Sequence, residues 1–129
     1  MLKANSIIAF VATANQSRAR DFYEKTLGLR LVSENHFASV FDAGGVMLRV
    51  TPVPKFQAAE HTVLGWVVKD IAKEVRELKK HGVKFQRYDW MEQDADDVWT
   101  SPDNAKVVWF HDPDGNILSL TEFGAQRGA

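Results

Sequence analysis

The sequence predicts an α+β fold built from two βαβββ modules. In each half of the chain an apolar run of strand length precedes an amphipathic helical stretch, and further strand-like runs follow. A linker at about 52–61, with two prolines and small or polar residues, separates the halves. Aligning Gly45 with Gly115 superimposes FDAGGVMLRVT on FHDPDGNILSLT, which indicates an internal duplication. We expect one domain over 1–129, with module one at about 1–54 and module two at about 62–129.

The first half begins with SIIAFVAT (6–13), whose apolar, β-branched and aromatic residues are typical of a buried strand. The spacing of apolar residues then predicts a helix over about 16–26, with Ser17 as its N-cap and Gly28 as its stop. The tight connection AGG (43–45) joins the last two of three expected strands. These strands are LRLVSEN (29–35), FASVFD (37–42) and VMLRVT (46–51).

The second half repeats this order. A strand is expected at TVLGWVVK (62–69), and a helix over about 70–81 has Asp70 as its N-cap and Gly82 as its stop. A polar and aromatic stretch at 88–104 is either a solvated loop or a lid over a cavity. Three further strands are expected at VKFQRY (83–88), AKVVWF (105–110) and NILSLTEF (116–123).

Asp112, Pro113, Asp114 and Gly115 are predicted to form a turn and not a metal site. Aspartate suits the first position of a turn, proline has the fixed φ of the second, and glycine adopts positive φ. The glycine stands too early for an EF-hand, and Phe123 occupies the place of the closing glutamate.

Composition excludes several classes of function. The 129 residues have 45% apolar content and no cysteine, so disulfides, thiolate metal sites and cysteine nucleophiles are excluded. A net charge of −1 gives no bulk field that would recruit nucleic acid or an anionic membrane. No signal peptide or long apolar run is visible. We therefore expect a soluble cytoplasmic protein with neither a nucleic-acid partner nor a membrane partner.

RARDFYEKTLGLRLV in the first half and VVWFHDPDGNILSLTEF in the second are similar to segments of a known family. Together with the preceding strands, they make the whole chain resemble the vicinal oxygen chelate superfamily. Glyoxalase I, extradiol dioxygenases and bleomycin-resistance proteins belong to it. The resemblance implies that each module curls its sheet and that the concave faces form a cavity. It also implies a homodimer and, in the enzymes, a metal held by His, Gln or Glu at four strand positions.

Transferring those four positions to this sequence gives Ile8, Leu64, Arg49 and Ser119. None has the carboxylate or imidazole ligands that a divalent metal requires. The resemblance therefore implies the fold without the metal, and we expect no metal and no other cofactor. His61 and His111 are at most weak candidates, the former for metal binding and the latter as an acid or base.

Strand alternation predicts which residues line the cavity. We expect Ile8 and Phe10 from one first strand, and Leu64 and Trp66 from the other, to face it. Arg49 either pairs with a protein carboxylate or anchors an anionic ligand with Ser119 as a hydroxyl partner. The complete predicted ligand-binding set is Arg49, Ser119, Trp66, Phe10, Ile8, Leu64, Met47 and Thr121.

Two functions remain open at this stage. The first is metal-independent binding of a small anionic or aromatic molecule, similar to the bleomycin-resistance branch. The second is a lyase, isomerase or dioxygenase relative whose metal ligands are rearranged or absent. The missing metal ligands favour the binding protein. The fold by itself does not decide further, because one fold can support many functions.

Overall fold

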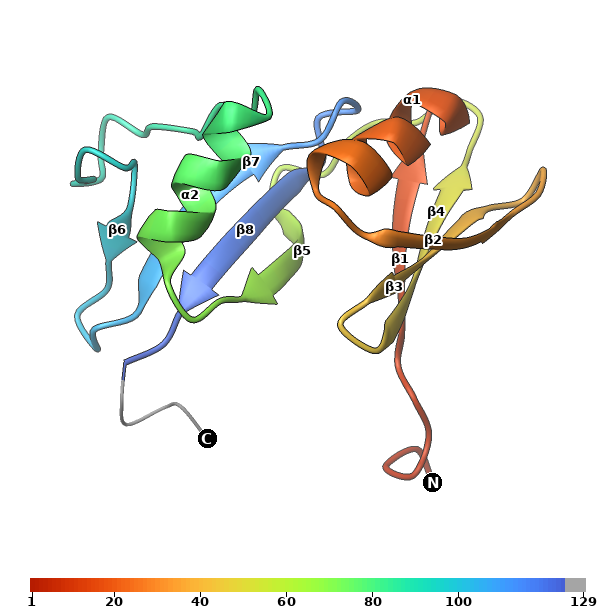
Figure 1. The fold of residues 1–129 in the computed structure, drawn as a ribbon, viewed down its shortest axis with the longest axis horizontal. Helices are drawn as coiled ribbons and strands as arrows, with labels where there is room; N and C mark the ends of the chain where they lie inside the picture. The colour runs from red at the N-terminus through yellow and green to blue at the C-terminus, as the bar shows by residue number, and fades with distance from the viewer. Residues whose placement is uncertain (125–129) are drawn as a thin grey trace. The chain divides into compact units, whose positions relative to one another are not determined.

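The computed structural model describes residues 1–124 and divides the chain into two compact units, Met1–Ala58 and Ala59–Ala129. The division falls inside the expected linker. Each unit contains its own four-stranded mixed sheet, and neither sheet closes on itself (Figure 1). The predicted α+β fold of two modules is confirmed.

The first unit has the strand order β1-β4-β3-β2. Strand β1 runs parallel to β4, whereas β3 is antiparallel to both β4 and β2. The helical segments connect β1 to β2, so the unit is a βαβββ module. Its elements are β1 (Ile8–Thr13), α1 (Gln16–Asp21), η1 (Phe22–Thr26), β2 (Arg30–Glu34), β3 (Ser39–Ala43) and β4 (Val46–Pro52).

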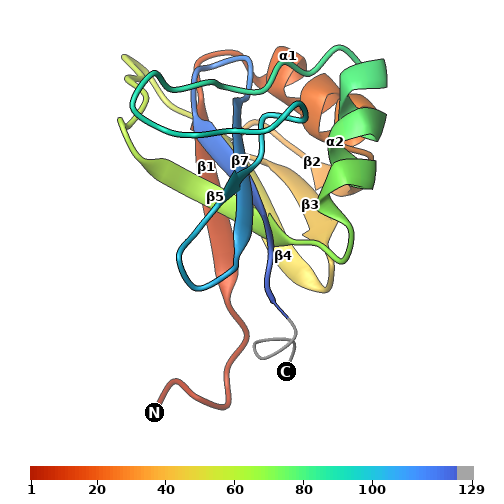
Figure 2. The same cartoon turned by 90° about the vertical axis from the view of Figure 1, so that its left-hand side faces the viewer.

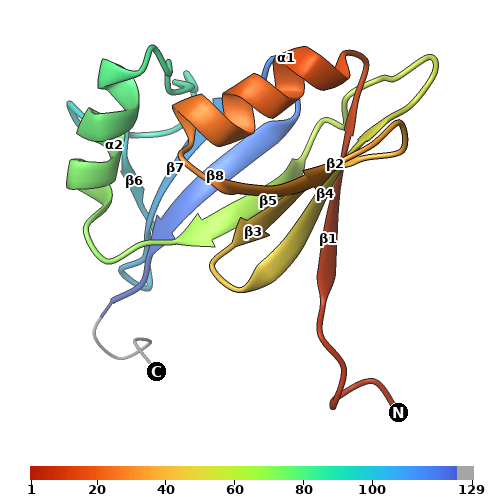
Figure 3. The ribbon, with the colours of Figure 1, turned by 45° about the vertical axis from the view of Figure 1, so that its right-hand side comes forward.

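The predicted helix over 16–26 is present, but its second half is π-helical. In the π turn η1, the N–H of Leu27 donates to the carbonyl of Phe22 at 2.9 Å. Figure 3 shows α1 and η1 as one continuous coil on one side of the first sheet. The expected N-cap, Ser17, is wrong: Asn15 caps the helix, and its side-chain oxygen accepts from both a first-turn N–H and the Ser17 hydroxyl. Gly28 ends the segment at φ +76°.

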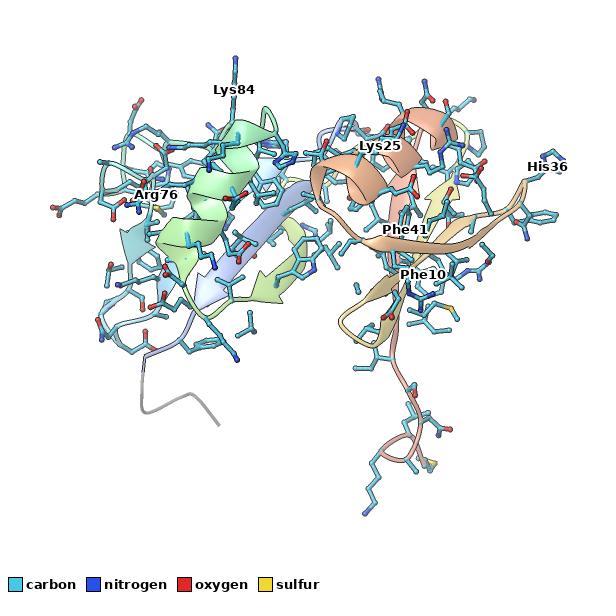
Figure 4. The ribbon with its side chains drawn as sticks, viewed as in Figure 1. Phe10, Lys25, His36, Phe41, Arg76 and Lys84 are labelled. Carbon is cyan, nitrogen blue, oxygen red and sulfur yellow. The ribbon has the colours of Figure 1, made fainter. Side chains whose placement is uncertain are left out.

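A hydrophobic core fills the space between the first sheet and its helical segments. Tyr23 is fully buried there, and its ring centroid lies 6.0 Å from that of Phe41. Leu48 and Val50, on β4, are fully buried on the same side of the sheet. The other side remains open, and Figure 4 shows Phe10 there, away from the helical side that Phe41 faces.

The second unit has the strand order β5-β8-β7-β6, with β5 parallel to β8 and the other pairs antiparallel. The predicted helix over 70–81 is confirmed as α2, and its N-cap is Asp70, whose carboxylate accepts from the N–H of Lys73 at 3.2 Å. The elements are β5 (Thr62–Val67), α2 (Ile71–Lys80), β6 (Trp99–Thr100), β7 (Lys106–His111) and β8 (Ile117–Glu122).

The strand predicted at 83–88 is wrong. Only Phe85 pairs there, through a single bridge to Phe110, and the strand beside β7 is the two-residue β6. The next residues instead bond to one another. The amide of Gln93 accepts from the N–H of Tyr88 at 2.8 Å and donates to the carbonyl of Gln86 at 2.9 Å. Figure 2 shows the long irregular path between α2 and β6.

The segment Asp112–Asn116 is the predicted turn. The carboxylate of Asp112, only 5% exposed, accepts from the N–H groups of Asp114 and Asn116, both at 2.9 Å. Gly115 adopts φ +86°, as expected. The carboxylate of Asp112 therefore organises the connection between β7 and β8.

A polar network connects α1 to the β2–β3 hairpin. The fully buried hydroxyl of Ser39 donates to Glu34 at 2.6 Å and accepts from Gln16 at 3.2 Å. The carboxylate of Glu34 also pairs with Arg20 at 3.1 Å. The hydrogen bond from Ser39, followed by those from Arg20, lowers the pKa of Glu34 against an opposing effect of burial.

We expect Ser39→Ala to lower the free energy of unfolding by about 1–2 kcal/mol, because Glu34 and Gln16 both lose a partner. The depressed pKa of Glu34 contributes stability above the ordinary glutamate value, and this contribution disappears as pH falls through the folded-state pKa. The variant should therefore lose less stability on acidification than the parent. Urea titrations at neutral and acidic pH measure both effects. Ser33→Ala, at an exposed position of β2, is the control, and an equal loss in it would contradict the network.

Candidate functional site

The open face of the first sheet brings together four of the predicted site residues. In the parallel β1–β4 pair, Ile8 lies opposite Met47 and Phe10 lies opposite Arg49. Residues opposite each other in a sheet extend from the same face. Burial follows this alternation, since Val11 and Leu48 are buried on the helical side while Ile8, Phe10 and Met47 are exposed. Ile8, Phe10, Met47 and Arg49 therefore share the face of the first sheet that points away from the helical segments.

A hollow of about 620 Å³ lies on this unit, with Arg49 among its lining residues. Phe10, Phe37, Thr51 and His36 are also among the lining residues. Phe10 is 63% exposed and Phe37 is 76% exposed, so their rings are available for contact. Figure 4 shows His36 at the tip of the connection between β2 and β3. The hollow therefore combines apolar rings with a fixed cation.

Arg49 is half-buried, and no residue in the described range 1–124 forms a hydrogen bond or ion pair with its guanidinium. The structural alternative requires a carboxylate of the protein to pair with Arg49, and no carboxylate within residues 1–124 does so. Asp42, on the same sheet, bonds instead to the N–H of Gly45 at 2.8 Å and to Arg30 at 3.2 Å. These two contacts, in that order, lower the pKa of Asp42. Arg49 thus retains its hydrogen-bonding capacity for a ligand.

A second, smaller hollow of about 250 Å³ is also lined by the first unit. It is mainly apolar, with Val32, Val40 and Met47 among its lining residues. Val40 on β3 lies opposite Arg49 in the sheet, and Phe10 on β1 lies opposite Arg49 on its other flank. The neighbourhood of Arg49 therefore offers apolar contact from both adjacent strands.

In the second unit, two predicted site residues have the wrong orientation. Leu64 lies opposite Leu118 and Trp66 opposite Leu120, whereas Ser119 lies opposite Gly65. Leu64 and Trp66 therefore do not share a face with Ser119. The cause is an irregularity between Thr62 and Leu64, where the register shifts by one residue. One extra residue in a strand moves every following side chain to the other face.

Two observations distinguish the open face of the second sheet from the face that packs against α2. A Cβ added to Gly65 would lie 2.6 Å from the hydroxyl oxygen of Ser119, so both positions point to the same side. On the other side, the carboxylate of Glu122 accepts from the N–H of Ile71 at 3.0 Å, at the start of α2. Alternation along β8 places Leu118 and Leu120 with Glu122, facing the helix, and Thr121 with Ser119 on the open face.

The open face of the second sheet has an aromatic surface that sequence reasoning did not assign to the site. Trp109 lies opposite Ser119, and Trp99 lies opposite Val107 on the same face. The Trp99 and Trp109 ring centroids are 6.1 Å apart, and Tyr88 contacts Trp109 edge-to-face at 5.9 Å. Alternation from Ser119 across the β7–β8 hairpin would have identified Trp109, but nothing local in the sequence places Tyr88 beside it.

These positions do not fit the divalent metal that the superfamily's enzymes hold. Ile8, Arg49 and Ser119 supply no carboxylate or imidazole, and the register replaces Leu64 with Gly65 on the open face. Within residues 1–124, no three His, Asp or Glu side chains converge to form a metal site. His61 and His111 are both exposed.

The fold defines a class of proteins made of paired βαβββ modules. The chain belongs to the Glyoxalase/Bleomycin resistance protein/Dioxygenase superfamily, whose model matches residues 5–120. No curated protein matches the sequence. In the described part of the chain, no helix has the length and apolar character needed to cross a membrane.

Solved structures from this superfamily share the fold at low sequence identity. A glyoxalase/bleomycin resistance protein/dioxygenase from Alicyclobacillus acidocaldarius is 16% identical, with a TM-score of 0.75, and the match covers 95% of this chain and 94% of that one. A superfamily member from Sphaerobacter thermophilus is 22% identical, with a TM-score of 0.74 and coverages of 95% and 99%. The fosfomycin resistance protein FosX from Listeria monocytogenes is 9% identical, with a TM-score of 0.74 and coverages of 98% for both chains.

Proposed function

We propose that the protein binds a small anionic molecule with an apolar or aromatic body, without a metal ion, and that Arg49 is the anchor. The observation that carries the proposal is the half-buried guanidinium of Arg49, which has no hydrogen-bond or ion-pair partner among residues 1–124 and lies in a hollow of about 620 Å³ in the first unit. Arginine presents its N–H donors in a planar fork that matches a carboxylate or phosphate group.

The surroundings of Arg49 support this class of ligand. Phe10 and Phe37 offer exposed rings beside the cation, and apolar surface with a few fixed polar groups is typical of small-molecule sites. His36 adds a donor at the rim of the same hollow. One structural relative, FosX, is named for resistance to the antibiotic fosfomycin, and the superfamily's name includes bleomycin resistance proteins. A binding function for this chain is consistent with that background.

Calorimetric titration with benzoate and benzamide tests the proposal. The two compounds have the same ring and nearly the same shape, but only benzoate carries a charge. We expect benzoate to bind at least about tenfold more tightly, because only the carboxylate forms charge-assisted bonds with Arg49. Calorimetry is preferable to fluorescence because all four tryptophans lie in the second unit. Equal affinity for both compounds would contradict an anionic ligand.

We expect the purified protein to hold no stoichiometric metal after incubation with zinc, nickel, iron or manganese and removal of free ions. A divalent ion at the superfamily's positions would lose water beside the fixed charge of Arg49, with no anionic ligand to compensate. Elemental analysis measures the result. One tightly held ion per chain would overturn the metal-independent proposal and favour the enzyme alternative.

We further propose that the protein is a homodimer. Strands β1 and β5 are edge strands of their sheets, and exposed apolar residues lie along them, including Ile8 on β1 and Val67, 73% exposed, on β5. Exposed sheet edges with apolar side chains favour association. Light scattering at high micromolar concentration should give the mass of two chains. The mass of one chain would contradict the proposal.

A further inference from the structure

A second hollow with a different chemical character lies in the second unit. It measures about 360 Å³ and is lined by Glu92, Gln93, Asp94, Val98, Trp99 and Thr100. The lining thus includes one tryptophan and two acidic residues. The Arg49 hollow belongs to the first unit, so the two hollows share no residue.

Trp99 is the end of a continuous aromatic row formed by Tyr88, Trp90, Trp99 and Trp109. Trp99 contacts Trp109, Trp109 contacts Tyr88, and Tyr88 contacts Trp90 at 5.5 Å between centroids. Contact with Trp109 restricts the orientation of the Trp99 indole. At the other end Trp90 is 77% exposed, which is unusual for a residue of this size.

The charges around the aromatic row are strongly negative. The segment 86–104 contains six acidic residues and one basic residue. The basic residue, Arg87, is already neutralised by an ion pair with Asp97 and by the carbonyls of Gln93 and Asp94. This local excess of negative charge repels anions and attracts cations.

Only some of these carboxylates are available to a ligand. Asp96 pairs with Arg76 at 3.1 Å, Asp97 pairs with Lys79 at 3.2 Å, and Asp94 accepts from main-chain N–H groups. The exposed carboxylates of Glu92 and Asp89, by contrast, have no partner among residues 1–124. Glu92 lines the hollow beside Trp99, and Asp89 precedes Trp90 at the exposed end of the row.

We propose that this hollow binds an organic cation carried on a planar or aromatic body. The positive charge lies against the face of Trp99 and pairs with Glu92, since a cation is attracted to the π-face of an indole ring and the carboxylate adds a direct charge contact. The aromatic row extends the apolar contact toward Trp90. The two units of this duplicated chain thus recognise opposite charges.

Quenching of tryptophan emission by N-methylquinolinium tests the proposal, since all four tryptophans lie in the second unit. Quinoline at mildly alkaline pH is the uncharged match, and naphthalene-2-sulfonate is the anionic match. We expect the cation to bind about tenfold more tightly than quinoline at low salt, and the sulfonate to bind more weakly than both. Equal binding of the three compounds, or a preference for the sulfonate, would overturn the proposal.

Glu92→Gln removes the charge and keeps the shape of the side chain. We expect it to weaken binding of N-methylquinolinium by about threefold to tenfold and to leave quinoline binding unchanged. Glu60→Gln, at another exposed glutamate of the same unit, is the matched control and should have no effect. If Glu92→Gln binds the cation as well as Glu60→Gln does, the contact between Glu92 and the cation is refuted.

Trp99→Leu should weaken the binding of both N-methylquinolinium and quinoline, because both compounds lose their contact with the indole ring. Calorimetry replaces fluorescence as the readout for this variant. Unchanged affinity for both compounds would place them elsewhere and overturn the proposal. Arg49→Met, in the first unit, should leave quinolinium binding unchanged. A loss of N-methylquinolinium binding in Arg49→Met would contradict the proposal that the two sites are separate. If benzoate does not bind the unmodified protein, only the proposed function at Arg49 is contradicted.

Discussion

Arg49→Met is expected to lower the affinity for benzoate by tenfold or more while the protein stays folded. A hydrogen bond to a charged group contributes about 1.5–3 kcal/mol, which corresponds to that loss or more. Methionine retains most of the aliphatic length, so packing beside Phe10, which lies opposite on β1, is largely preserved. Calorimetry gives the affinity, and circular dichroism shows whether the fold is intact.

Arg30→Met is the matched control for this experiment. Arg30 lies on β2 of the same sheet, is 70% exposed and already pairs with Asp42 at 3.2 Å. Its loss should change benzoate affinity little, because an exposed ion pair contributes little and Arg30 does not line the hollow. Benzoate affinity that stays the same in a folded Arg49→Met protein would refute the anchor role. Unfolding of the variant would instead indicate that Arg49 supports the structure.

Leu118→Ala is expected to lower the free energy of unfolding by about 2–5 kcal/mol, the largest stability effect that we predict. Leu118 is fully buried on the face of β8 that packs against α2, and it lies opposite Phe110 and Leu64. Truncation removes buried apolar surface and leaves a cavity between the sheet and the helix. Urea unfolding followed by tryptophan emission reports on this unit, since it contains every tryptophan.

Ser119→Ala is the adjacent control, on the opposite face of the same strand. Ser119 is only 9% exposed, but its hydroxyl forms no hydrogen bond with any residue from 1 to 124. Its removal should therefore change stability by less than about 1 kcal/mol. If the two variants lost similar stability, the assignment of faces along β8 would be wrong, since burial alone does not distinguish them.

The orientation of the first sheet was predictable from the sequence because its register is regular. The alternation of Ile8, Ala9, Phe10 and Val11 continues without interruption through the β1–β4 pair. In the second sheet the same reasoning failed at Leu64 and Trp66, because an irregularity of one residue between Thr62 and Leu64 reverses the alternation. No feature of TVLGWVVK marks that position, since valine and leucine are both acceptable on either side of a buried strand.

The strand expected at 83–88 failed for a different reason. VKFQRY has the composition of a strand, but Gln86, Arg87 and Tyr88 bond to the loop that follows and not to β7 alone. These partners lie up to ten residues away, and their convergence depends on how the loop closes. Local propensity therefore yields to tertiary hydrogen bonds.

The sequence by itself determined the two modules, the capping of α2 by Asp70, the turn at Asp112 and the lack of metal ligands at Ile8, Arg49 and Ser119. These features depend on residue type, local spacing and turn chemistry, which act over a few residues. Only the tertiary structure decided that Arg49 is unpaired within residues 1–124, that Gly65 and not Leu64 accompanies Ser119, and that an aromatic row ends at Trp99. These depend on strand register and on side chains distant in sequence, because a shift of one residue or one long-range hydrogen bond changes which groups meet.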